Sequence, residues 1–305
     1  MKLRIATRQS PLALWQANHV KELLLRAHAD LKVELLSLTT RGDQWQEQSL
    51  AKLGGKGLFV KELEEALIDG RADLAVHSMK DVPALLPDGL RLSAFLAAED
   101  PRDAFVCARH SRLEQLPKHA VIGSTSLRRA SQLLSLRPDL KVRDLRGNVG
   151  TRLKKLDDHE FDAILLACAG LKRLGLQERI AEALDPQKFV PAVGQGIIGV
   201  ECRDDDKSTR KFLRALNDDA SATRLSAERA LNQGLGGNCN VPVAGHAVLK
   251  AGRISLTGLV ASPDGQNLVR ATIEGAVADA EAIGRSLAEQ LLTMGAKKIL
   301  RELKA

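Results

Sequence analysis

The sequence of 305 residues contains no tyrosine, and phenylalanine and tryptophan together account for only 3% of it. Proteins that bind single-stranded nucleic acid use aromatic side chains as stacking platforms for the bases, so this scarcity argues against that class of partner. The chain also lacks an apolar run long enough to cross a bilayer. Its first residues, MKLRIATR, show neither the apolar core nor the small-residue cleavage site of a secretory signal. We therefore expect a cytoplasmic protein without a nucleic-acid or membrane partner.

Cysteine is also rare, with four residues in the whole chain. None of them forms a C-x-x-C pair, and no His/Cys cluster has zinc-ligand spacing, so we expect neither a disulfide framework nor a metal site. Cys107, Cys168 and Cys202 lie in apolar, strand-like runs and are expected in the core. Cys239 lies in a glycine-rich segment and is the candidate reactive thiol, although an ordinary loop cysteine is the alternative.

What the chain does contain is enough apolar sequence for two or three domain cores and an excess of positive charge. Hydrophobic residues make up 44% and charged residues 27%, values typical of a folded protein. The formal net charge is +7. A basic balance of this size favours acidic partners, such as acidic metabolites.

The first two thirds of the chain alternate short β-rich runs with amphipathic helical runs. Expected strands cover residues 3–7, 33–38, 72–76, 120–122, 141–145 and 162–167, and expected helices begin at Ser10–Pro11 and cover 58–68, 127–136 and 149–156. A break at residues 99–103 looks like a crossover. This order predicts two α/β units in series, each with a mostly parallel sheet, and a ligand site at the carboxyl ends of the strands.

The character of the sequence changes after about residue 219. A helix is expected over residues 222–231, and strands over 247–249, 254–260 and 269–273, with a hairpin turn at 262–265. Residues 278–303 are expected to be largely helical, with an interruption near Gly295. This pattern predicts a small α+β domain with an antiparallel sheet.

Seven arginines lie between residues 124 and 173, in segments expected to be loops or first turns of helices. They are Arg128, Arg129, Arg137, Arg143, Arg146, Arg152 and Arg173. A positive side chain at a helix start adds to the positive end of the helix dipole. No local partner is evident from the sequence, so we expect an external ligand that carries several carboxylates or phosphates.

Three short motifs match known patterns only superficially. Residues 194–199 (GQGIIG) fit the dinucleotide fingerprint but precede an apolar run instead of following a strand, so a hinge is the better interpretation. Residues 54–57 (GGKG) lack the phosphate-loop spacing and indicate a lid or a surface loop. His77, Ser78 and Asp81 are too close along one strand end to form a hydrolase triad, and His77 is expected to be a partly buried structural residue.

Nine segments, in this order and spacing, resemble the porphobilinogen deaminase family nearly end to end. They are IATRQSPLA (5–13), TRGD (40–43), GGKGLF (54–59), VHSMKD (76–81), STSLRR (124–129), LRGNVGTR (145–152), ACAGLKR (167–173), AVGQG (192–196) and the loop around Cys239. The resemblance implies that four porphobilinogen molecules condense head to tail, each losing ammonia, and that water releases hydroxymethylbilane. It also implies a dipyrromethane cofactor, made from the substrate and joined through a thioether to Cys239. Asn238 stands where the family usually has glycine.

The resemblance also assigns roles to residues. Asp81 matches the catalytic carboxylate, which would stabilise the cationic azafulvene left by loss of ammonia. The residues expected at the cofactor are Lys80, Ser126, Arg128, Arg129 and Arg152. The residues expected at the substrate are Arg8, Ser10, Arg146, Arg152 and Arg173, and Lys56 and Phe59 are expected on a lid loop. Arginine suits an acetate or propionate group because its planar fork binds a carboxylate through two hydrogen bonds.

The fold implied by the resemblance is α/β: two domains like those of type II periplasmic binding proteins, plus a small C-terminal α+β domain. Domain 1 would cover residues 1–98 and 196–216, domain 2 residues 102–192, and domain 3, which carries the cysteine loop, residues 219–305. We expect a monomer in haem or other tetrapyrrole biosynthesis. The alternative is a non-enzymatic solute-binding protein for a polyanionic small molecule, which shares this architecture but would need no reactive cysteine.

Overall fold

A computed structural model describes residues 1–40, 60–236 and 241–303. The chain divides into two compact units. The first comprises Met1–Glu99 with Ile197–Ala222, and the second comprises Asp100–Gly196 with Thr223–Ala305. The chain therefore leaves the first unit after residue 99 and returns to it after residue 196, which are the two places where the sequence predicts a crossover and a hinge.

The first unit is built on a mixed five-stranded sheet with the order β2-β1-β3-β10-β4. Its strands are β1 (Lys2–Arg8), β2 (Lys32–Leu38), β3 (Leu74–Ser78), β4 (Leu90–Phe95) and β10 (Ile198–Arg203). Strand β10, supplied by the returning chain, runs antiparallel to both β3 and β4, while β1 is parallel to β2 and β3. The helices of this unit are α1 (Pro11–Ala27), α3 (Lys61–Ile68) and α7 (Lys207–Leu213).

The two faces of this sheet have separate cores because side chains alternate along each strand. Leu3, Ile5 and Val76 pack with α1 on one face. Ala6 and Ala75 pack with α3 on the other face. The sheet thus holds the carboxyl ends of β1 and β3 side by side at one edge.

The second unit contains a sheet of the same design, with the order β7-β6-β8-β5-β9. Its strands are β5 (Asp103–Val106), β6 (Val121–Gly123), β7 (Lys141–Arg143), β8 (Ala163–Ala167) and β9 (Glu182–Ala183). Strand β6 is parallel to β7 and β8, and β5 is antiparallel to its neighbours β8 and β9. The associated helices are α4 (Leu127–Leu136), α5 (Val149–Asp157) and α6 (Cys168–Arg173).

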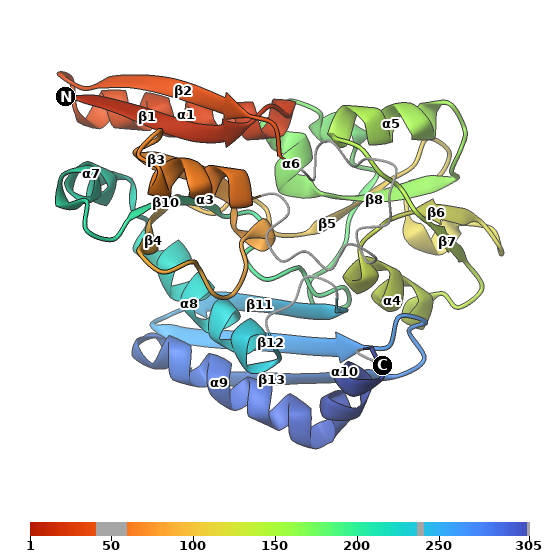
Figure 1. The fold of residues 1–305 in the computed structure, drawn as a ribbon. Helices are drawn as coiled ribbons and strands as arrows, with labels where there is room; N and C mark the ends of the chain where they lie inside the picture. The colour runs from red at the N-terminus through yellow and green to blue at the C-terminus, as the bar shows by residue number, and fades with distance from the viewer. Residues whose placement is uncertain (41–59, 237–240, 304–305) are drawn as a thin grey trace. The chain divides into compact units, whose positions relative to one another are not determined.

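A three-stranded antiparallel sheet, β11 (Val243–Lys250), β12 (Arg253–Ala261) and β13 (Leu268–Ala276), completes the second unit. Its core is shared with α8 (Asp219–Gly234) and α9 (Ala280–Leu291), which follows the lower edge of the view in Figure 1. Gly258 on the central strand allows this packing, because a Cβ there would meet Leu231, Leu287 and Leu291. The helix beyond α9 is interrupted at Gly295, where φ is 119°, before α10 (Lys297–Glu302).

The expected fold class is confirmed: two mostly parallel α/β sheets, each with one reversed strand, are followed by a small α+β part. The expected interruption at Gly295 and the hairpin at residues 262–265 are also present. The sequence analysis missed β4, β9 and α7 and recognised β5 and β10 only as apolar, strand-like runs. These elements are short, and β5 and β10 begin right at the connections between the units, where Gly and Pro signals dominate the local sequence.

Five short 3-10 turns and one π-type turn complete the secondary structure of the described residues. They are η2 (Met79–Asp81), η3 (Leu113–Gln115), η4 (Gln177–Arg179), η5 (Arg214–Leu216) and η6 (Val277–Asp279), with η7 (Leu292–Ala296) between α9 and α10. None of the helices in the described ranges is long and apolar enough to cross a membrane.

Candidate active site

In the first unit, two of the expected binding residues follow strand β1. Arg8 is the last residue of β1 and is half-buried. Ser10 is the N-cap of α1, and its hydroxyl accepts a hydrogen bond from the backbone N–H of Ala13 at 3.4 Å. Pro11 occupies the first helical position, where a missing N–H costs nothing. The strand-to-helix junction thus places a basic side chain and the capped first turn of a helix at the carboxyl edge of the sheet.

Lys80 and Asp81 lie at the same edge, in the turn η2 that directly follows β3. Both are half-buried. The turn is braced from two sides. Gln16 of α1 donates to the hydroxyl of Ser78 at 2.8 Å, and the backbone N–H of Met79 donates to the carbonyl of Ile197 at 3.0 Å. A carboxylate held on a rigid turn is preorganised for electrostatic catalysis.

The structure buries His77 more deeply than the sequence suggests, and it gives the residue a structural partner. The ring Nε2 lies 2.9 Å from Oε2 of Glu201 on the neighbouring strand β10, and both side chains are buried. Burial and the nearby Glu201 raise the pKa of Glu64 on α3 to about 7, against a smaller opposing effect of His77. This acidic cluster lies inside the first unit.

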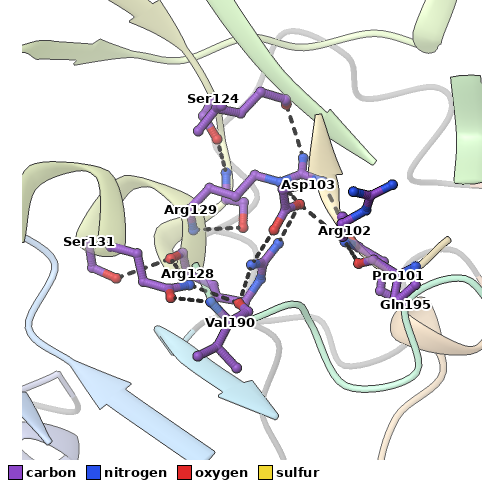
Figure 2. A network of polar contacts seen from close by, with 12 residues as sticks. Pro101, Arg102, Asp103, Ser124, Arg128, Arg129, Ser131, Val190 and Gln195 are labelled. Carbon is purple, nitrogen blue, oxygen red and sulfur yellow. Dashed lines mark hydrogen bonds and ion pairs between the residues drawn. The ribbon is translucent and has the colours of Figure 1, made fainter. Parts of the chain in front are cut away.

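In the second unit, α4 follows strand β6 as α1 follows β1. Ser126 is the N-cap of α4, and its hydroxyl accepts from the backbone N–H of Arg129 at 3.4 Å. Arg128 and Arg129 lie in the first turn, as expected, but their side chains turn inward and are buried. Both contact Asp103, the first residue of β5, as Figure 2 shows.

The contacts with Asp103 are short and almost inaccessible to solvent. Arg128 forms two hydrogen bonds to the carboxylate, at 2.7 and 3.0 Å, and Nε of Arg129 forms a third at 2.8 Å. Burial by itself would raise the pKa of Asp103, but the two guanidinium groups outweigh it and hold the pKa well below its usual range. Burial lowers the pKa of Arg129, an effect that Asp103 opposes and Arg128 reinforces.

The expectation that the seven arginines lack local partners is therefore wrong. Arg137 forms a bidentate pair with Asp139, and Arg146 lies 3.1 Å from Asp144. The others donate to backbone carbonyls: Arg143 to Glu160, Arg152 to Gly147 at 2.8 Å and Arg173 to Gly196 at 2.7 Å. A sequence cannot show these partners because several come from distant segments.

Two of these arginines lie at the C-terminal end of a helix. Arg137 is the C-cap of α4, and Arg173 is the last residue of α6. A positive charge at a helix C-terminus is favoured by the helix dipole, so the electrostatic conflict inferred from the sequence does not exist at these two positions.

Arg146 differs from the buried Arg128 and Arg129 because the carboxylate that it contacts is exposed to solvent. It follows β7 in the chain and its side chain is 21% exposed, whereas Asp144 is 69% exposed. A pair with so exposed an acid contributes little free energy. The pair with Asp144 by itself therefore holds the guanidinium of Arg146 only weakly.

The described cysteines differ in their surroundings. Cys168 and Cys202 are buried, as expected, and burial raises the pKa of both thiols, that of Cys168 to about 12. Cys107 is only half-buried and not a core residue, and its Sγ lies 3.3 Å from the carbonyl of Asp162. Cys239 lies outside the described residues, as do Lys56 and Phe59.

The sequence analysis missed Asp103 and Gln195 as parts of this site. Gln195 is buried and donates to the carboxylate of Asp103 at 3.2 Å and to the carbonyl of Pro101 at 2.6 Å. Asp103 was assigned to an irregular crossover. The apolar run that begins right after it, residues 104–106, was the available signal for a buried strand whose first residue is acidic.

Each α/β unit thus places basic side chains and capped helix starts after its parallel strands, and the first unit adds a braced carboxylate. These features define an α/β protein with basic candidate binding positions at the ends of its parallel strands. The chain belongs to the porphobilinogen deaminase family. Residues 3–211 match the family model described as "Porphobilinogen deaminase, dipyromethane cofactor binding domain", and residues 222–293 match "Porphobilinogen deaminase, C-terminal domain".

This membership confirms the resemblance seen in the sequence and decides against the solute-binding alternative. The chain is an enzyme of tetrapyrrole biosynthesis. It condenses four porphobilinogen molecules into hydroxymethylbilane with release of ammonia, and it uses a dipyrromethane cofactor.

The chain also shows weaker similarity to several solved structures. The VFT2 domain of BvgS from Bordetella pertussis shares 17% identity at a TM-score of 0.46, over 73% of this chain and 91% of that one. A putative methionine-binding lipoprotein from Bacillus subtilis shares 13% at 0.45, over 72% and 92%. A periplasmic substrate-binding protein of an ABC transporter from Coxiella burnetii shares 16% at 0.43, over 72% and 94%.

Proposed function

We propose that Asp81 is the catalytic carboxylate of this enzyme and that Cys239 carries the dipyrromethane cofactor. The observation that carries the first assignment is the braced turn η2, which follows β3 at the edge of the sheet where Arg8 and Ser10 follow β1. Active sites of α/β folds form at this edge.

The chemistry of the reaction fits a carboxylate among cations. When ammonia leaves the aminomethyl group of porphobilinogen, positive charge develops on the pyrrole. Asp81 stabilises that charge and accepts a hydrogen bond from a pyrrole N–H. A preorganised group of this kind contributes about 3–4 kcal/mol to lowering a barrier. The basic residues bind carboxylates and are unsuited to stabilising a cation, so the acid is assigned the chemical step.

The attachment to Cys239 is supported by the properties of the other thiols. A thioether forms from a thiolate, and the raised pKa of Cys168 and of Cys202 makes both thiols poor nucleophiles. Cys107 is half-buried against a backbone carbonyl. Cys239 is flanked by glycine-rich sequence, and Asn238 tolerates the positive φ that a tight loop requires.

The residues proposed to hold the cofactor are Lys80, Ser126, Arg128, Arg129 and Arg152. The cofactor supplies the pyrrole end from which the product chain grows. Each pyrrole of the cofactor carries an acetate and a propionate. The buried cluster of Arg128, Arg129 and Asp103 fits a carboxylate of this kind, because two cations and one anion leave a net positive charge where water is excluded. The hydroxyl of Ser126 lies one turn away, at the start of the same helix.

The residues proposed to bind the substrate are Arg8, Ser10, Arg146, Arg152 and Arg173. Their guanidinium groups suit the acetate and propionate of each pyrrole. Lys56 and Phe59 are proposed to lie on a lid loop over the substrate. The resemblance of the nine sequence segments to the family supports these roles. The exposure of Asp144, which makes its pair with Arg146 weak, is added support for Arg146 alone.

We further propose that the enzyme acts as a monomer in the cytoplasm. The proposed domain division is residues 1–98 with 196–216, residues 102–192 and residues 219–305. The three separate sheets, one for each of these parts, support that division.

An intact-mass measurement tests the attachment. Protein made in cells that supply porphobilinogen should carry the added mass of a dipyrromethane, and Cys239→Ser should carry none. Cys107→Ser is the matched control and should keep the added mass. Loss of the mass in Cys107→Ser, or its retention in Cys239→Ser, would move the attachment to another residue.

A further inference from the structure

The cluster of Arg128, Arg129 and Asp103 has a feature that cofactor binding alone does not explain. Two guanidinium groups, adjacent in sequence, meet on one carboxylate inside the second unit (Figure 2). Asp103 is 0% exposed, Arg128 5% and Arg129 6%. Residues of these types are seldom buried to this extent unless they are paired.

Two buried cations side by side are unfavourable for two reasons. Each loses its hydration, and each repels the other in a medium of low effective dielectric constant. Asp103 offsets both costs because one carboxylate lies within hydrogen-bonding distance of both guanidinium groups. With Asp103 the cluster is a monocation, and without it the cluster would be a dication.

The same contacts also fix the direction of each guanidinium. Arg128 donates to the carbonyl of Val190 at 2.8 Å as well as to Asp103, and Arg129 donates to the carbonyl of Leu165 at 3.1 Å. Gln195 closes the arrangement, because it donates to Asp103 and accepts from Arg129 at 3.5 Å. Neither arginine can rotate without breaking several of these bonds.

We propose that Asp103 is a positioning residue for the cofactor: it keeps Arg128 and Arg129 charged, buried and aimed at a carboxylate before that carboxylate arrives. This inference rests on the proposed function, in which both arginines hold the cofactor. Groups preorganised in this way do not pay the cost of ordering when the ligand binds. Asp103 touches neither substrate nor cofactor in this role.

The test uses full-length Asp103→Asn and Asp103→Glu, with Asp139→Asn as the matched control. Asp139 pairs with Arg137, the C-cap of α4, through bonds of 2.6 and 2.7 Å. The control therefore removes a partly exposed carboxylate that is bound by an arginine just beyond the same helix. Apo-protein made in cells without porphobilinogen is incubated with porphobilinogen. The covalently loaded fraction is then read by intact mass, at a temperature where a denaturant titration shows each variant to be folded.

We expect the rate of loading in folded Asp103→Asn to fall by about tenfold or more, which is the effect of losing one charge-assisted hydrogen bond. Asp103→Glu should recover part of the loss because it restores the carboxylate, and Asp139→Asn should load like the unaltered protein. A purely structural role would lower stability but leave loading of the folded fraction unchanged, and that result would overturn the proposal. Equal losses in Asp139→Asn would overturn it as well.

Gln195→Met provides a second route if Asp103→Asn does not fold. It removes the hydrogen bonds of Gln195 to Asp103 and Arg129 without leaving two cations unpaired. Slower loading with an unchanged denaturation midpoint supports the positioning role, and unchanged loading contradicts it. If the unaltered protein itself gains no mass, the attachment in the proposed function has failed, whereas normal loading of folded Asp103→Asn removes only the role of Asp103.

Discussion

Ser10 and Ser126 occupy equivalent positions in the two α/β sheets. Each caps the helix that follows the strand lying between two parallel neighbours, β1 in one sheet and β6 in the other. Each hydroxyl accepts a hydrogen bond from the backbone N–H three residues ahead, at 3.4 Å. The two units therefore use the same local device to present a helix start at the edge where ligands bind.

Replacing either serine with alanine should destabilise the protein. Ser10→Ala and Ser126→Ala each leave a helix N–H without its cap, which costs about 1 kcal/mol. Chemical denaturation followed by circular dichroism measures the change. Ser135→Ala, at an exposed position within α4, is the control and should be neutral or slightly stabilising because alanine favours the helix. A cap variant as stable as this control would show that the capping bonds contribute nothing.

Asp81→Asn should keep the fold and the covalent cofactor but lose turnover. The amide is nearly isosteric with the carboxylate yet provides no negative charge for the cationic transition state, so the rate should fall by about 10²- to 10³-fold. Steady-state assay and intact mass together measure both properties. Asp88→Asn changes an exposed acid seven residues further on and should have normal kinetics. Turnover near the normal rate in Asp81→Asn would remove this residue from the chemical step.

Arg146→Leu should raise KM more than it lowers kcat. The lost charge-assisted contact corresponds to about a tenfold weaker engagement of porphobilinogen at low salt, and the difference should shrink as salt screens the charges. Kinetic assays across a range of ionic strength measure it. Arg179→Leu removes an arginine that pairs with Asp157 at 2.6 Å and should leave KM unchanged. A KM for Arg146→Leu that matches the control at low salt would contradict the assignment.

Glu64→Gln should stabilise the protein at alkaline pH. Burial and Glu201 raise the pKa of Glu64 from 4.5 to about 7, so the folded state binds a proton that the unfolded chain has released. Stability from this group therefore falls as pH rises between about 4.5 and 7, and the cost remains above that window. The variant should gain about 2 kcal/mol at pH 8 and almost nothing at pH 4.

Denaturation midpoints of Glu64→Gln and of the unaltered protein at the two pH values measure this gain. Glu65→Gln is the control, because Glu65 is exposed and lies 3.8 Å from Lys61 on the surface of the same helix. A gain of the same size at both pH values would mean that the titration of Glu64 is not its source.

Much of the fold and of the family follows from local sequence. The alternation of strands and helices, the Ser10–Pro11 helix start and the hairpin at residues 262–265 are all visible in neighbouring residues, because caps and turns depend on short-range geometry. The order and spacing of nine segments were enough to identify the enzyme family. The residues assigned to substrate and cofactor by that resemblance remain predictions that the variants above test.

The sequence by itself determined which side chains the enzyme has, including seven arginines near one another in the chain and a cysteine in a glycine-rich segment. Only the tertiary structure decided what each arginine contacts. Asp103 is 25 residues from Arg128, and Gln195 is 66 residues from Arg129, yet the sheet of the second unit brings all four together. Burial follows from this packing and not from residue type. For this reason Arg128 and Arg129, which were expected to bind an external anion, both bind the internal carboxylate of Asp103.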